Sequence, residues 1–104
     1  MKITFPDSTW WEILDEMPYG VDRKMKRIMG RLGDQPISAD TVDEVNTMVL
    51  LDCTPKWSFG EVAEECLNQL PRWKVNHVLS TMFQLYEARD LEMEEELKKV
   101  PSNI

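Results

Sequence analysis

Histidine and cysteine are scarce in this sequence of 104 residues, which has one histidine, His77, and two cysteines, Cys53 and Cys66. The common structural zinc sites use four cysteine or histidine ligands, so three such residues cannot complete one unless carboxylates join them. No cysteine or carboxylate stands three or four positions from His77, so a helix there would offer no local metal site. We therefore expect no bound metal and no cofactor.

The other residues that carry catalysis are also missing or badly placed. The glycines are isolated at Gly20, Gly30, Gly33 and Gly60, so no glycine-rich phosphate loop is present. A Cys–His dyad is conceivable in space, yet both cysteines fall on apolar faces or at the ends of predicted helices. Burial raises the pKa of a thiol and makes it inert. The sequence therefore predicts a protein that is not an enzyme.

Long apolar runs are absent too. No stretch of 18 apolar residues exists, which excludes a membrane-spanning helix. Met1-Lys2 opens into a short mixed segment with no apolar stretch of signal-peptide length. We expect a cytoplasmic protein that makes no membrane contact and has two reduced thiols.

Basic charge is in deficit, because the net charge is −7. Such a balance argues against nucleic-acid binding, which needs a basic surface. The exception is the segment 22–31, whose basic residues are Arg23, Lys24, Lys26, Arg27 and Arg31. The simplest interpretation is a solvated helix face. The functional alternative that we carry forward is contact with another protein or with a second copy of the chain.

What is present predicts a mainly α fold: a compact four-helix domain with a short N-terminal β-hairpin and a charged C-terminal helical extension. We place the domain at residues 1–88 and the extension at 89–104. The β-formers before and after the turn signal at 6–9 predict the hairpin. The alternative is a helix that starts after Asp7 or Ser8, both of which are good caps.

Apolar periodicity predicts the helices. The first spans 21–32, with Gly33 as its stop, and the second follows Thr41, which would form a capping box with Glu44. Ser58 and Glu61 would cap a short helix over about 59–70. Pro71 then suits the first turn of a fourth helix. In the charged extension, the i,i+4 spacing of Glu94 with Lys98 and of Glu95 with Lys99 predicts ion pairs.

Tryptophan is abundant, with four copies at positions 10, 11, 57 and 73. Trp10 and Trp11 are adjacent, so in a strand they point to opposite faces. Trp57 stands just before a predicted cap, and it either packs on its own helix or is an exposed anchor for a partner. The candidate partner-binding residues are Trp57, Phe59, Arg23, Lys24, Arg27, Arg31 and Trp11.

Two runs of the sequence resemble a known group of proteins. The first is Val49-Leu50-Leu51, then Lys56-Trp57-Ser58-Phe59-Gly60-Glu61-Val62, then Glu65, Leu67 and Leu70-Pro71; the second is Met17-Pro18-Tyr19-Gly20. Over about residues 1–88, this pattern resembles the small tail-assembly proteins of siphophages, particularly of phages that infect actinobacteria. The charged segment 89–104 has no counterpart in that pattern.

This resemblance implies a mainly helical, non-enzymatic tail assembly chaperone that binds the tape measure protein before the tail tube polymerises. Its place of action would be the cytoplasm of the host cell. Two alternatives remain open. One is a structural virion component, such as a head–tail connector or adaptor subunit, for which a basic and an acidic pole would suit contacts in a ring. The other is a different small helical protein-interaction module.

Overall fold

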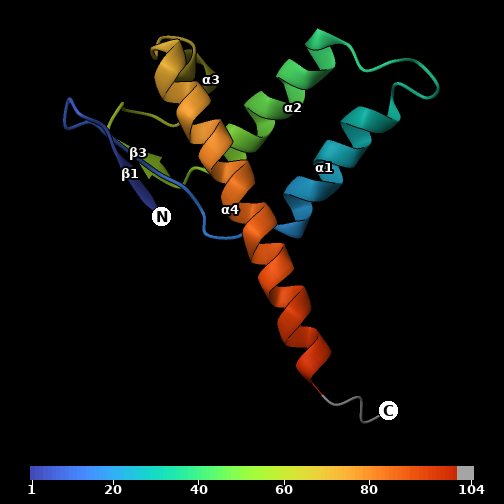
Figure 1. Ribbon diagram of the computed structural model, residues 1–104. Coiled ribbons are helices and arrows are strands. Elements are labelled where there is room, and N and C mark those ends of the chain that lie inside the picture. Colours follow the sequence, from blue (N-terminus) through green and yellow to red (C-terminus); the bar gives the residue numbers. More distant parts are fainter. Residues whose placement is uncertain (101–104) are drawn as a thin grey trace.

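The computed structural model describes residues 1–100, and residues 101–104 lie outside this range. A small sheet stands beside a set of helices, one of which extends well beyond the rest (Figure 1). The elements in chain order are β1 (Lys2–Thr4), β2 (Trp10–Glu12), α1 (Tyr19–Gly30), α2 (Ala39–Asp52), β3 (Lys56–Trp57), α3 (Glu64–Leu67) and α4 (Arg72–Lys99). The mainly α prediction is thus confirmed.

The predicted hairpin is present, and the alternative helix at this place is not. Strands β1 and β2 pair antiparallel with Ile3 opposite Trp11. The turn between them is closed by a hydrogen bond from Phe5 N to Thr9 O of 2.8 Å, and Ser8 adopts a positive φ of 72°. A third strand, β3, pairs antiparallel with β2 and places Trp57 opposite Trp11. The sequence did not predict this strand.

The core lies where the sheet packs against α2 and α4. Its largest fully buried side chains are Trp11, Ile13, Met82, Val49, Val78 and Cys53. Trp11 and Trp57 meet edge to face with ring centroids 4.8 Å apart. The Trp11 indole also donates a hydrogen bond of 2.7 Å to Thr54 Oγ1, so its polar atom is satisfied within the core. Trp10, on the other face of the strand, lies only partly buried beneath the ammonium of Lys2.

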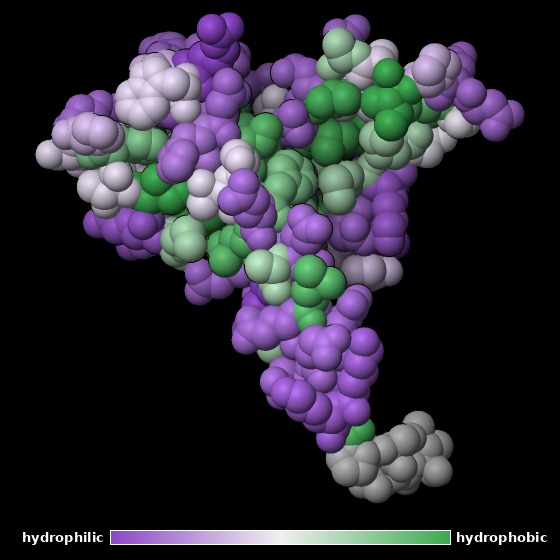
Figure 2. All heavy atoms as spheres, in the orientation of Figure 1, coloured by the Kyte–Doolittle hydropathy of each residue, from purple (hydrophilic) through white to green (hydrophobic). Residues whose placement is uncertain are grey.

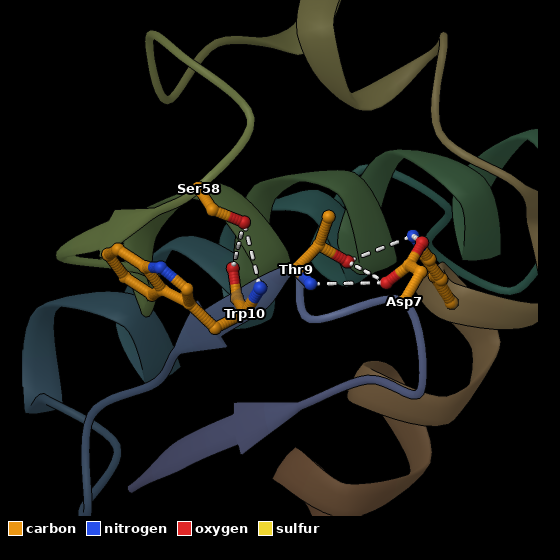
Figure 3. Close-up of polar contacts among 5 residues, drawn as sticks. Asp7, Thr9, Trp10 and Ser58 are labelled. Carbon is orange, nitrogen blue, oxygen red and sulfur yellow. Dashed lines mark hydrogen bonds and ion pairs between the residues drawn. The ribbon is translucent and has the colours of Figure 1, made fainter.

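Two predicted helix caps are wrong. Helix α2 begins earlier than expected, because Ser38 is its N-cap and accepts a hydrogen bond of 3.2 Å from Thr41 N. The predicted helix over 59–70 is reduced to the single turn of α3. Ser58 does not cap it, because its hydroxyl accepts a hydrogen bond of 2.7 Å from Trp10 N and donates one of 3.1 Å to Trp10 O (Figure 3). One of the four predicted helices is therefore very short, and the compact four-helix arrangement is only roughly met.

Helix α4 continues without a break through the predicted boundary at residues 88 and 89. Its C-terminal part, residues 89–99, which we call the α4 arm, projects away from the sheet and the other helices (Figure 1). Arg89 ties the base of the arm to the loop before α1 through an ion pair of 2.7 Å with Glu16. The predicted i,i+4 pairs in the arm are replaced by i,i+3 pairs, Lys98 with Glu95 and Lys99 with Glu96.

Candidate protein-binding groove

An apolar depression of about 450 Å³ lies between α1 and α2. On the α1 side it is lined by Met25 and Met29, and on the other side by Val42 and Val45 of α2 and by Ile37 of the preceding loop. Hydrophobic side chains gather over this helix pair in the space-filling view (Figure 2). Ile37 is 59% exposed and Val42 is 46% exposed, so water reaches apolar groups that would be buried in a well-packed domain.

A second depression of about 370 Å³ lies between α1 and α4. Its apolar lining comes from Met17 and Met25 on one side and from Phe83, Tyr86 and Leu91 of α4 on the other. Asp22 and Met25 line both depressions, so the two form one continuous surface. We call this surface the apolar groove. No part of the chain within residues 1–100 fills it.

The groove exists because three helix faces turn more apolar surface outward than the core can cover. Val42 lies next to the buried residues of α2, which are Thr41, Val45, Val49 and Leu50, but is itself exposed. Phe83 likewise lies beside the buried face of α4 and is 38% exposed. Exposed apolar groups in a contiguous patch are typical of a protein-interaction site.

Charged groups at the rim of the groove are mostly acidic. Three carboxylates, those of Asp22, Glu87 and Asp90, stand against one ammonium, that of Lys26. The ammonium is already used, because it forms an ion pair of 2.8 Å with Asp22, and this contact raises the pKa of Lys26. Glu87 and Asp90 are exposed and form no ion pair with another described residue. The open rim therefore carries negative charge.

The two tryptophans proposed as partner contacts are not on the surface, which corrects the prediction. Trp11 is fully buried and Trp57 is 5% exposed. Pairing of β3 with β2 turns Trp57 inward, and its indole donates a hydrogen bond of 3.1 Å to Gly60 O. Phe59 is half-buried with its ring centroid 5.6 Å from that of Trp57. The residues 57–59 therefore stabilise the core around the sheet and form no exposed anchor.

The predicted basic contacts stay on the surface, but the structure does not bring them to the groove. Lys24 forms an ion pair of 2.7 Å with Asp52, and Arg31 forms one of 3.0 Å with Glu44. Arg23 lies over the Tyr19 ring at 5.9 Å from its centroid. A separate shallow depression between α1 and α2 is lined by Lys24, Arg27 and Arg31. Internal partners thus neutralise part of the basic face.

The sequence did not predict that the residues lining the apolar groove together form a groove. Ile37 was the one available signal, since it is an isolated apolar residue in a polar loop next to Pro36. Nothing in the local pattern of α4 separates Phe83, which is exposed, from its neighbour Met82, which is fully buried.

The cysteine and the histidine considered for catalysis differ in their exposure to water. Cys53 is fully buried, and this burial raises the pKa of its thiol. His77 is exposed, with its ring centroid 6.3 Å from that of Phe5. Over residues 1–100 no group of three or more His, Cys, Asp or Glu is arranged to hold a metal ion. In the same part of the chain, no helix has the length and apolar character needed to cross a membrane.

Comparisons with known proteins found no match to this chain among protein-family models, curated proteins or solved structures. The function must therefore be inferred from the residues themselves and from the groove that they form.

Proposed function

We propose that this chain is a non-enzymatic protein-binding module that acts in the cytoplasm of an infected cell as a phage tail assembly chaperone, with the tape measure protein as its partner. The observation that carries the binding role is the continuous apolar groove formed by α1, α2 and α4. A protein that holds an aggregation-prone helical partner needs an open apolar surface of this kind. The choice of partner rests on the resemblance of the 17–20 and 49–71 segments to tail-assembly proteins.

Co-expression with the tape measure protein of the same phage tests the proposal. The expected result is a soluble complex that co-purifies, whereas a tape measure protein that stays insoluble without copurification contradicts the proposal. Two matched variants locate the contact. Ile37→Ser with Val42→Ser should abolish copurification. Leu97→Ser with Val100→Ser, which changes even more exposed apolar residues outside the groove, should not.

The alternative function, a structural subunit of the virion, makes a different prediction. Mass spectrometry of purified virions should lack this chain if it is a chaperone, because a chaperone leaves the finished particle. The basic pole that would favour ring contacts is weakened here, since Lys24 and Arg31 are ion-paired within the chain. We therefore prefer the chaperone to the connector.

A further inference from the structure

We propose that the apolar groove binds a basic amphipathic helix of the partner protein. This inference rests on the proposed function for the identity of the site and adds the chemistry of the segment that occupies it. It follows from the spacing of the groove residues, from the charge at its rim and from the inability of a second copy of the chain to provide a matching helix.

The spacing along both walls suits a helix. On α4, Phe83, Glu87 and Leu91 stand at i, i+4 and i+8, so they form one line along the helix. On α1, Asp22, Met25 and Met29 stand at i, i+3 and i+7 and form the facing line. Two helical walls that carry apolar side chains are the geometry in which a third amphipathic helix binds.

The methionines make the lining of the groove adaptable. Met17 and Met25 line the part of the groove next to α4, and Met29 continues it toward α2. The unbranched, polarisable side chain of methionine fits apolar partners of different shapes. A lining of this composition selects for an apolar helix face and does not require a particular sequence on that face.

The rim determines the charge of the partner. Glu87 and Asp90 at the groove, followed by Glu94 on the arm, form an acidic line on α4 at i, i+3 and i+7. None of the three has an ion-pair partner among the residues that the structure describes. Lysine or arginine on the flank of a bound helix would meet these carboxylates, whereas an acidic helix would place like charges side by side.

A second copy of the chain is a poor occupant. Its basic helix, α1, already buries Val21 and Ile28 in its own core, so that helix cannot offer this apolar face without leaving its domain. Its projecting arm carries Glu92, Glu94 and further glutamates, and it would be repelled by the acidic rim. The groove therefore fits a helix from a different protein.

Fluorescence anisotropy with designed peptides tests this inference on the full chain. The probes are labelled peptides of about 18 residues, or roughly five helical turns. One has leucine on a single helical face and lysine elsewhere, the second has the same leucines with glutamate, and the third has the lysine composition with the leucines scrambled. We expect the leucine–lysine helix to bind at least about tenfold more tightly than either of the others.

Charge reversal at the rim provides the decisive variant. Glu87→Lys with Asp90→Lys should invert the preference toward the leucine–glutamate peptide. The matched control, Glu64→Lys with Glu65→Lys, makes the same change of charge on α3 outside the groove and should preserve the original preference. All four positions are exposed, so the variants should fold, which circular dichroism would verify. Salt titration of the unmodified protein adds a measurement independent of folding, because added salt should weaken the lysine peptide selectively.

The inference would be overturned if the leucine–lysine and leucine–glutamate peptides bound equally well. It would also be overturned if the α3 control variant inverted the preference between these peptides. It would also be overturned by a concentration-dependent dimer that Val42→Ser with Phe83→Ser dissolves while no peptide binds, since the groove would then be an interface between copies. If the tape measure protein co-purifies without peptide selectivity, this inference fails and the proposed function stands. If the peptides discriminate but no tape measure protein co-purifies, the partner assignment fails and the groove chemistry stands.

Discussion

The ammonium of Lys74 in α4 donates hydrogen bonds to the carboxylate of Asp7 and to Thr9 Oγ1 in the hairpin turn, the second at 3.0 Å. Figure 3 shows Asp7 and Thr9 facing each other in this turn. The Lys74 side chain is only 5% exposed, whereas that of Asp7 is half exposed. The ammonium also lies 5.3 Å from the centroid of the Phe5 ring and 5.4 Å from that of Phe59. The contact joins the sheet to the long helix.

This ion pair predicts an acid-dependent loss of stability. The hydrogen bond from Lys74, aided by those from Thr9, lowers the pKa of Asp7 from 3.8 to about 2. Because the pKa is depressed in the folded state, the stabilisation is complete above the unfolded-state pKa and is lost as the pH falls from about 4 to about 2. Asp7→Asn should remove this pH-dependent contribution to stability. As the pH falls from about 4 to about 2, the urea midpoint of the variant should therefore decline less steeply than that of the unmodified protein.

Asp34→Asn is the control for this experiment, because Asp34 is exposed and forms no ion pair within residues 1–100. Its midpoints should follow the parent at every pH. Parallel curves for the parent and Asp7→Asn would show that the Lys74–Asp7 pair does not contribute to the acid dependence.

The elements that local pattern determines were predictable from the sequence. The hairpin follows from β-formers around a turn signal, and the start of α4 follows from Pro71. Ser58 illustrates the limit. Its spacing to Glu61 matches a capping box, but its hydroxyl bonds to the backbone of Trp10, which is 48 residues away. A tertiary contact of this kind replaces the local one and leaves no trace in the local spacing.

The candidate site was less predictable than the fold. Trp57 was proposed as an exposed anchor because tryptophan is common in interfaces, but its exposure depends on strand β3, a two-residue strand that no periodicity reveals. Val42 and Phe83 stand in helices that apolar periodicity predicts, yet both are exposed. Their exposure depends on how α1, α2 and α4 diverge, and that angle is set by packing between helices and not by the spacing within one of them.

Trp57 should contribute strongly to stability. Trp57→Ala would empty a buried site beside Trp11 and is expected to lower the free energy of unfolding by about 3–5 kcal/mol. Urea denaturation followed by circular dichroism measures the change. Trp73→Ala is the matched control, because Trp73 is 54% exposed and its loss should cost about 1 kcal/mol or less. If the two variants lost the same amount of unfolding free energy, the burial of Trp57 would be contradicted and Trp57 would be a surface residue.

Ser38 should stabilise the start of α2 in the way first expected of Thr41. Its side chain accepts a hydrogen bond from Thr41 N, so Ser38→Ala should lower the free energy of unfolding by about 1 kcal/mol. Thermal unfolding would report the difference. Ser80→Ala, in the exposed middle of α4, should leave stability unchanged or raise it by a few tenths of a kcal/mol, since alanine is the better helix former. A neutral Ser38→Ala would show that α2 does not depend on this cap.

The two cysteines should differ in reactivity with a thiol reagent under native conditions. Cys53 is fully buried and its raised pKa reduces the thiolate fraction at any given pH, whereas Cys66 is half-buried. Since the thiolate is the reacting form, we expect Cys53 to react at least about tenfold more slowly. Cys66→Ser should remove the fast phase, Cys53→Ser should retain it, and both thiols should react equally fast in denaturant. A Cys66→Ser protein that still reacts rapidly would mean that Cys53 is reachable in the folded chain, and the packing of α2 against α4 would have to open for that to happen.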